Sequence, residues 1–225
     1  MVTTKEFYDR FSSRYTEAIL KCVPRYQEML SALFYYLPDG FAPSGILELG
    51  CGTGNLSALV LRHFPNARFT AVDISGECIS ECKARLNDPS IEFIQEDFSK
   101  LTFPEGSFDL VVSSISIHHL ADFAKKRLFQ HVHGWLASGG FLTFSDQFRG
   151  ETEELYRKHM ELWRSHASEN NVTEEEWATW IEHQELHDHH SPLKSHLDWL
   201  AGCGFERPDC VWRYSLWAVI CAAKA

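Results

Sequence analysis

The chain has 225 residues, with 31 acidic and 21 basic side chains and a formal charge of −10 when histidine is neutral. That length suits one α/β domain with insertions, and the acidic balance argues against a nucleic-acid partner, which would need a basic surface. No apolar run approaches the length of a membrane span. Seven cysteines without paired spacing, and no signal peptide, indicate a reducing cytoplasm.

Residues 4–37 are predicted to be helical, with a break at Val23-Pro24. Pro24 is expected to open a second helix that buries Met29, Leu30, Leu33 and Leu37, because proline fits the first helical turn. These helices would form an N-terminal cap, residues 1–40, in front of the first strand.

Short apolar runs then alternate with periodic helical segments, which predicts five buried strands joined by helices. Lys125-Lys126-Arg127, in the last of these helices, is expected to be a solvated face, and Ser138-Gly139-Gly140 is expected to end that helix. This alternation is typical of a parallel sheet covered on both faces, with ligands at the carboxyl ends of its strands. The predicted strands are 46–50, 68–73, 91–95, 108–113 and 141–145.

Residues 150–192 break this rhythm, since they are polar and rich in Glu, His and Trp. Two helices are predicted there, at roughly 151–168 and 173–188. A further helix is expected at 193–202, followed by two β segments joined near Tyr214-Ser215. We therefore expect a helical insertion after the fifth strand and a final hairpin.

The segment GILELGCGTGNLS, residues 45–57, predicts a strand, a tight glycine turn and a helix. Such a turn brings backbone N–H groups and a helix N-terminus close to a ligand. The spacing is not that of the dinucleotide fingerprint G-x-G-x-x-G, because the third glycine comes one residue early and Asn55 occupies the later slot. Glu48, just before the first glycine, suits a cationic ligand.

The pattern E-L-G-C-G-T-G resembles the S-adenosylmethionine (SAM) loop of class I methyltransferases. The resemblance implies a Rossmann-like α/β fold with a mostly parallel seven-stranded sheet that ends in an antiparallel hairpin. It implies SAM as the methyl donor, S-adenosylhomocysteine as the product and a small-molecule acceptor. One domain is expected over 1–225, composed of the cap (1–40), a SAM-binding core (45–149), the helical insertion (150–192) and a final helix and hairpin (193–225).

The same resemblance implies roles for side chains at successive strand ends. A carboxylate at position 73 can accept both ribose hydroxyls, Asp97-Phe98 can meet the adenine, and two serines after the fourth strand would lie beneath the sulfonium. FYDRFSSRY looks like a cap that closes over the cofactor. The structural alternatives are a helix cap for Asp73 and a plain turn residue for Asp97. The expected cofactor-binding residues are Tyr8, Arg14, Tyr15, Glu48, Gly50, Cys51, Gly52, Gly54, Asn55, Asp73, Ile74, Asp97, Phe98, Ser113 and Ser114.

His119, with His118 as the alternative, is the candidate general base, because the transferred methyl should lie beyond the fourth strand. A base is needed only when the acceptor must lose a proton. Asp146, at the end of the fifth strand, could orient that base or bind the substrate. His183 and His187 share a helix face, but Glu185 is out of register for H-E-x-x-H. No metal site is therefore predicted. The histidines at 183, 187, 189, 190 and 196 are expected to be solvated or to line a substrate pocket, and metal binding by them is left open.

Two alternative functions stay open. The first is carboxy-SAM synthesis, because VPRY at 23–26 is similar to carboxy-SAM synthase. That enzyme holds the extra carboxylate with an arginine in the helix before the final hairpin, but no arginine lies between His196 and Phe205 here. Only Arg14, Arg149 and Arg213 could supply the positive charge instead. The second alternative function is a SAM-binding module without catalytic activity. The acceptor atom (O, N, C or S), the choice of tryptophans that line its pocket, and a homodimer are also left open.

Overall fold

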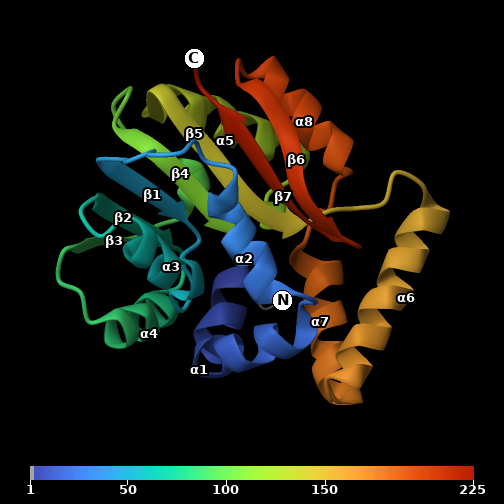
Figure 1. The fold of residues 1–225 in the computed structure, drawn as a ribbon. Coiled ribbons are helices and arrows are strands. Elements are labelled where there is room, and N and C mark those ends of the chain that lie inside the picture. Colours follow the sequence, from blue (N-terminus) through green and yellow to red (C-terminus); the bar gives the residue numbers. More distant parts are fainter. Residues whose placement is uncertain (1–2) are drawn as a thin grey trace.

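The computed structural model describes residues 3–225, in which a seven-stranded sheet is flanked by helices on both faces (Figure 1). The strand order is β3-β2-β1-β4-β5-β7-β6. The first five strands pair in parallel, whereas β7 runs antiparallel to β5 and β6, as the sequence predicted. The strands are β1 (Gly45–Leu49), β2 (Arg68–Asp73), β3 (Ile91–Gln95), β4 (Phe108–Ser114), β5 (Leu136–Gln147), β6 (Glu206–Tyr214) and β7 (Trp217–Ala223).

The helices divide between the two faces and one edge of this sheet. Helices α2 to α4 lie on the face viewed in Figure 1, α5 and α8 lie behind it, and α1, α6 and α7 lie beyond the edge toward which the parallel strands point. The helices are α1 (Thr4–Cys22), α2 (Tyr26–Tyr35), α3 (Asn55–His63), α4 (Gly76–Leu86), α5 (Asp122–Trp135), α6 (Glu153–Glu169), α7 (Glu174–His187) and α8 (Leu193–Gly202). Two 3₁₀ turns, η1 (Phe98–Lys100) and η2 (Ile117–His119), lie between strands.

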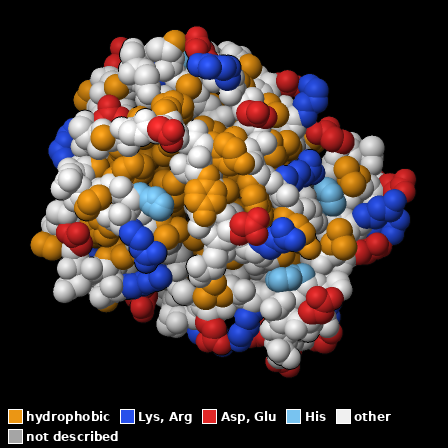
Figure 2. Space-filling view, viewed as in Figure 1, with side chains coloured by type: hydrophobic (Ala, Val, Ile, Leu, Met, Phe, Trp, Pro, Cys, Tyr) orange, Lys and Arg blue, Asp and Glu red, His pale blue; other side chains and the backbone are white. Residues whose placement is uncertain are grey.

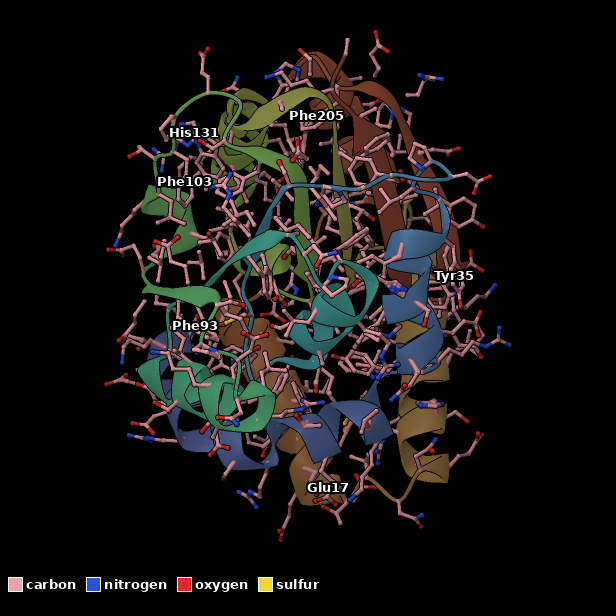
Figure 3. All side chains as sticks on the ribbon, turned by 60° about the vertical axis from the view of Figure 1, so that its left-hand side comes forward. Glu17, Tyr35, Phe93, Phe103, His131 and Phe205 are labelled. Carbon is pink, nitrogen blue, oxygen red and sulfur yellow. The ribbon has the colours of Figure 1, made fainter. Side chains whose placement is uncertain are left out.

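Alternation along the central strands builds one core on each face. Ile46 and Leu110 pack toward α2 and α3, whereas Leu47 and Val111 pack toward α5 and α8. All four are fully buried, as expected for strands covered on both sides. Side chains fill the spaces between the sheet and both helical layers (Figure 3).

The surface agrees with the mixed but acidic composition. Figure 2 shows side chains of both charge signs spread over the viewed face, with hydrophobic side chains between them. No helix within residues 3–225 is long and apolar enough to cross a membrane.

Capping explains where α1 and α7 begin. Thr3 accepts a hydrogen bond from the Glu6 N–H, and the Glu6 side chain accepts one from the Thr3 N–H. Thr173 and Glu176 form the same reciprocal pair at the start of α7. Each pair satisfies backbone donors that a helix start leaves free.

The predicted boundaries of α2 and β5 were wrong. Helix α2 begins at Tyr26 rather than at Pro24, because Arg25 adopts a left-handed conformation (φ 54°) that turns the chain before the helix, and α2 ends at Tyr35 before Leu37. Strand β5 begins at Leu136, so Gly139 and Gly140 lie inside the strand. Gly139 has φ 78°, and a Cβ on Gly140 would approach the Asp109 carbonyl to 3.0 Å, which explains the glycines at this irregular pairing.

Lys125 is buried, which corrects the prediction of a solvated face, although Lys126 and Arg127 are exposed. Its Nζ donates to the Ser191 hydroxyl at 2.9 Å and to the His189 carbonyl. The ammonium group therefore ties α5 to the chain that follows α7.

Candidate functional site

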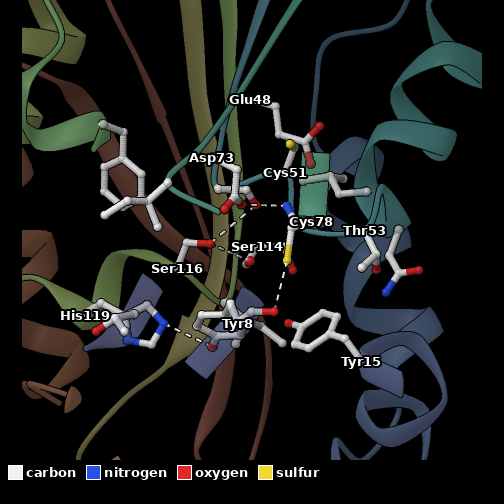
Figure 4. Close-up of a pocket in the computed structure, with 18 of the residues that line it drawn as sticks. Tyr8, Tyr15, Glu48, Cys51, Thr53, Asp73, Cys78, Ser114, Ser116 and His119 are labelled. Carbon is white, nitrogen blue, oxygen red and sulfur yellow. Dashed lines mark hydrogen bonds between the residues drawn. The ribbon is translucent and has the colours of Figure 1, made fainter. Parts of the chain in front are cut away.

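A cavity lies at the carboxyl ends of β1, β2 and β4, beneath α1. Figure 4 shows Tyr8 between His119 and Tyr15 on one side, with Asp73, Ser114 and Ser116 opposite. Its lining includes Tyr8, Tyr15, Glu48, Gly50, Cys51, Gly52, Asn55, Asp73, Ile74, Phe98, Ser114 and His119 among the predicted site residues.

Positions 50 and 54 of the turn require glycine because each has a positive φ and a close neighbour where a Cβ would lie. Gly50 has φ 76°, and a Cβ there would lie 2.0 Å from the Ser116 Oγ. Gly54, with φ 85°, precedes α3, and its Cβ would lie 2.7 Å from the Cys82 Sγ. The turn therefore packs directly against the end of β4 and against α4, with backbone exposed to the cavity.

Glu48 is a buried carboxyl group on the cavity wall. The Ser57 hydroxyl donates to its Oε2 at 2.6 Å. Burial raises the pKa of Glu48 well above its usual value, and the Ser57 hydrogen bond only partly opposes this rise. A cation bound in the cavity would favour the ionised form, because opposite charges lower a carboxyl pKa.

Asp73, at the end of β2, is held by the turn that it faces. Its Oδ2 accepts from the Gly52 N–H at 2.7 Å, and its Oδ1 accepts from the Ser75 N–H at 2.9 Å. Ser75, not Asp73, caps α4, because its hydroxyl accepts from the Cys78 N–H. Each carboxylate oxygen keeps a second lone pair for a ligand.

Asn55 offers the cavity an unused donor. Its Oδ1 accepts from the Thr16 hydroxyl and from Arg85, whereas its Nδ2 is buried without a partner in the protein. A buried donor without an acceptor is costly, so the site is suited to a ligand that brings an acceptor such as a carboxylate.

The end of β4 carries strained backbone. Ile115 has φ 53°, which is an outlier for a β-branched residue, and its N–H donates to the Ser145 carbonyl at 2.8 Å. Such strain costs of order 1–3 kcal/mol and collects at functional sites. Ser113 does not reach the cavity, because its hydroxyl donates to the Leu49 carbonyl at 2.7 Å.

His119 projects from η2 into the cavity. Its Nε2 lies 3.2 Å from the Tyr8 hydroxyl, and its Nδ1 lies 2.9 Å from Asp188 Oδ1. Burial and the adjacent His118 lower the pKa of His119, so the imidazole is neutral at physiological pH. Asp188 therefore favours the proton on Nδ1 and leaves Nε2 as an acceptor toward the cavity.

His118 points elsewhere. Its Nδ1 lies 2.5 Å from Asp146 Oδ1, and its backbone N–H donates to Asp146 Oδ2 at 2.9 Å. Burial alone would lower the pKa of His118, but Asp146 and Asp188 outweigh it and raise the pKa. Asp146 therefore orients His118. The carboxylate that faces His119 is Asp188, not Asp146.

A second cavity adjoins the first and shares Tyr8, Tyr15 and Ile115 with it. Its wall combines aromatic, aliphatic and amide side chains with two histidines and one carboxylate. The buried indole N–H of Trp217, one of its lining residues, has no partner in the protein. Its other lining residues include Trp163, Trp180, Gln147, Gln184, His118, His183 and Asp188.

Besides Ser113, four predicted site residues lie outside the wall of the first cavity. Arg14 is exposed and lines a groove between α1 and α7. Asp97 accepts from the Ser99 N–H at 2.9 Å and caps η1, so its adenine role stays a prediction, while Phe98 does line the cavity. Gly54 and His118 also lie outside its wall.

Sequence reasoning missed several wall residues. Thr53 and Leu56 belong to the glycine motif and its helix, so that motif could have included them. Thr4, Tyr26, Cys78, Ile115 and Ser116 reach the wall from separate elements, and no local pattern marks them.

Comparisons with known proteins agree on one class. Residues 46–140 match the family model described as a methyltransferase domain. A malonyl-[acyl-carrier protein] O-methyltransferase of Herminiimonas arsenicoxydans is 30% identical over 193 residues, which cover 80% of this chain and 70% of that protein. Malonyl-[acyl-carrier protein] O-methyltransferase 1 of Ilyobacter polytropus is 39% identical over 101 residues, 44% of this chain and 37% of that protein. The chain spans less than half the length of the two Ilyobacter polytropus relatives, 37% and 45%.

Solved structures share the fold. Phosphoethanolamine N-methyltransferase 2 of Haemonchus contortus, in complex with SAM, aligns with a TM-score of 0.72 and 14% identity over all of this chain and 60% of that chain. A SAM-dependent methyltransferase of Thermotoga maritima, described as a possible histamine N-methyltransferase, aligns with a TM-score of 0.66 and 18% identity over 98% and 99% of the two chains.

We predict that Gly50→Ala destabilises the protein more than Gly40→Ala does. Both glycines have φ near 77°, but nothing lies within 4 Å of a Cβ on Gly40, whereas a Cβ on Gly50 would overlap Ser116. The left-handed backbone should cost both variants about 1–2 kcal/mol, and the overlap should cost Gly50→Ala a further 1–3 kcal/mol or so. Urea denaturation measures both. Adding Ser116→Gly should recover part of the extra loss, and equal losses in the two single variants would disprove the close packing.

We also predict that Glu48→Gln changes how stability depends on pH. Because the pKa of Glu48 is raised by folding, protonated Glu48 contributes stability below its ordinary value, and this contribution disappears as the pH rises through the raised pKa. The variant should match the wild type in acid and exceed it at higher pH, by roughly 1.4 kcal/mol per pKa unit of the rise. Thermal unfolding across pH tests this. Glu92→Gln, at a surface glutamate that accepts from Thr70, should leave the pH profile unchanged.

Proposed function

Because this chain belongs to the class I SAM-dependent methyltransferases, we propose that it transfers the methyl group of SAM to a small molecule bound beside Tyr8 and His119. The observation that carries the proposal is the pair of adjoining cavities that share Tyr8, Tyr15 and Ile115 at the strand ends. One would hold the donor and the other the acceptor. SAM, when bound, supplies a methyl group already activated on a cationic sulfur.

The first cavity suits SAM in the chemistry of its wall. Glu48 is a buried acid that a cation would ionise, and the free Nδ2 of Asn55 can donate to a carboxylate. Asp73 keeps acceptor capacity for hydroxyl groups. We assign the helices of residues 1–40 and 150–192 the role of closing both cavities, which would exclude water from the reacting atoms.

The second cavity favours an acceptor with a flat apolar part and no negative charge. Trp163, Trp180 and Trp217 supply aromatic surface, and Asp188 supplies a carboxylate. Within residues 3–225, neither of the two adjoining cavities has a lysine or arginine in its wall. An acid such as the malonyl group named for the relatives would meet the Asp188 carboxylate and no lysine or arginine here, so we propose a neutral or cationic free molecule.

The same observation weakens the carboxy-SAM alternative. That ligand needs a cation, yet Arg14 lines a separate groove, Arg149 lines another cavity, and Arg213 is exposed. A nucleic-acid acceptor is also disfavoured by the net charge of −10 and by the mixture of acids and bases on the face in Figure 2. All seven cysteines are free, which supports a reaction in the cytoplasm.

We assign His119 as the base when the acceptor must lose a proton. Its neutral imidazole presents Nε2 to the cavity, and Asp188 lies at hydrogen-bonding distance from Nδ1. This is the arrangement in which a carboxylate holds the tautomer and orientation of a histidine base. The Tyr8 hydroxyl, 3.2 Å from Nε2, marks where an acceptor O–H or N–H would bind.

Isothermal titration with SAM, followed by incubation of the protein with methyl-labelled SAM and a metabolite extract, tests the function. We expect SAM binding and labelled small molecules detected by mass spectrometry. Asp73→Ala should weaken SAM binding by more than about 100-fold, since two hydrogen bonds to a charged group are lost. Asp88→Ala, which removes a carboxylate that likewise accepts a backbone N–H but lies outside the cavity, should bind normally. SAM binding without any labelled product would favour the non-catalytic module.

His119→Gln should slow methyl transfer by about 10²- to 10⁴-fold, the usual contribution of a positioned base, while SAM affinity changes little. Steady-state kinetics and titration separate the two effects. His131→Gln, on α5 and outside both cavities, is the matched control. An unchanged rate in His119→Gln would remove the base assignment.

A further inference from the structure

A second feature lies behind His119, where three histidines converge on one oxygen. His119 Nδ1, His118 Nε2 and His183 Nε2 lie 2.9, 3.5 and 3.8 Å from Asp188 Oδ1. His190 Nε2 lies 3.6 Å from the other oxygen of Asp188. The side chains of His118, His183, His190 and Asp188 are only 3–6% exposed. These groups are therefore largely shielded from bulk solvent.

The converging atoms are left without regular hydrogen bonds. His119 Nδ1, both ring nitrogens of His183, His190 Nε2 and Asp188 Oδ1 are all buried and have no partner of proper geometry. Native proteins rarely leave buried polar atoms unpaired, and each needs an explanation such as an ion. Three of the unpaired nitrogens, His119 Nδ1, His183 Nε2 and His190 Nε2, face the Asp188 carboxylate, which indicates a place for a positive centre.

Asp146 prepares His118 for such a centre. An ionised carboxylate can only accept, so the 2.5 Å contact puts the His118 proton on Nδ1 and leaves the Nε2 lone pair directed toward Asp188. In neutral His118 this lone pair faces a carboxylate, and a cation bound between the two groups would be attracted by both. A carboxylate that holds the far nitrogen of a histidine is the usual outer partner of a metal ligand.

The chain that carries Asp188 is fixed in place. The His189 N–H donates to the His118 carbonyl at 2.8 Å, and Lys125 donates to the His189 carbonyl and to the Ser191 hydroxyl. Asp188 is thereby placed next to η2, nearly seventy residues earlier in the sequence. The ligand geometry is therefore built by rigid elements, which a selective metal site requires.

We propose that His118 Nε2, His119 Nδ1 and Asp188 Oδ1 bind a divalent transition-metal ion, with His183 Nε2 within reach as a fourth ligand. The three ligand atoms lie within 4.8 Å of one another. Ligands bonded at about 2.0–2.2 Å to one ion lie roughly 3–4 Å apart, close to the 2.9 and 3.5 Å that separate His119 Nδ1 and His118 Nε2 from Asp188 Oδ1. Imidazole nitrogens with one carboxylate suit Zn²⁺, Fe²⁺ or Ni²⁺ rather than Mg²⁺ or Ca²⁺.

An entry path exists on the outer side. A cavity lined by Arg149, Tyr156, Gln184, His189 and His190 also reaches Asp188 and shares no lining residue with the first cavity. A metal on Nδ1 would keep the His119 proton on Nε2, so His119 would then donate into the cavity. The base role of His119 therefore belongs to the metal-free form.

The test uses the full-length protein, stripped with chelator and titrated with Zn²⁺ and with Co²⁺ in the absence of SAM. We expect about one bound ion per chain by elemental analysis, and visible absorption bands from Co²⁺ held by nitrogen ligands. Asp188→Asn should weaken Zn²⁺ binding by more than about 100-fold, and Asp146→Asn by about 10- to 100-fold because it acts through His118. His189→Ala, which removes an exposed imidazole from the same segment, should bind like the wild type.

Circular dichroism and thermal unfolding show whether each variant folds; if Asp188→Asn does not, Asp146→Asn decides. A wild type that holds no ion, or variants that bind as tightly as His189→Ala, would overturn the proposal and leave a cluster neutralised by an imidazolium alone. Since metal binding is measured without SAM, this result is independent of the proposed methyl transfer.

Discussion

The close approach of Gly50 to Ser116 is the contact on which the site geometry depends. A Cβ on Gly50 would overlap the Ser116 side chain, so only glycine lets the ends of β1 and β4 meet at this distance. The same turn places the Gly52 N–H against Asp73, and Asp73 also receives the N–H of Ser75. One steric constraint thus sets the relative positions of three strand ends and leaves a cavity between them, with backbone donors and a carboxylate already oriented.

A second constraint comes from charge that the fold has buried. Asp146 and Asp188 are both nearly inaccessible, and their surroundings are imidazoles rather than arginines. An isolated buried carboxylate is strongly unfavourable, so a positive charge must lie beside them, carried by His118 or by a bound cation. Lys125 does not fill this role, since its Nζ donates to Asp122, His189 and Ser191. Its place beneath the 189–191 segment instead fixes the carboxylate of Asp188 among the histidines.

The sheet and the glycine-turn side of the first cavity were predictable because their signals are local. The turn at Gly50–Gly54 and the acid at Asp73 each follow a strand directly, so sequence order becomes spatial order at the strand ends. Asp188 could not be predicted, because it meets His119 only through the packing of α7 against α1 and the sheet edge. Lys125 was misread for a related reason: its helix pattern is that of a surface, and the segment that buries it follows sixty residues later.

The two cavities share part of their wall, and each also has lining residues of its own. Tyr8, Tyr15 and Ile115 belong to both cavities, whereas the glycine turn belongs only to the first and the tryptophans of α6 and α7 only to the second. Ile115 holds a left-handed backbone to place its side chain in that wall. Strain of this kind persists only where surrounding packing imposes it, and here the β4–β5 pairing and the Gly50 contact do so. Substitutions in α6 and α7 can therefore reshape the second cavity without moving the glycine turn that lines the first.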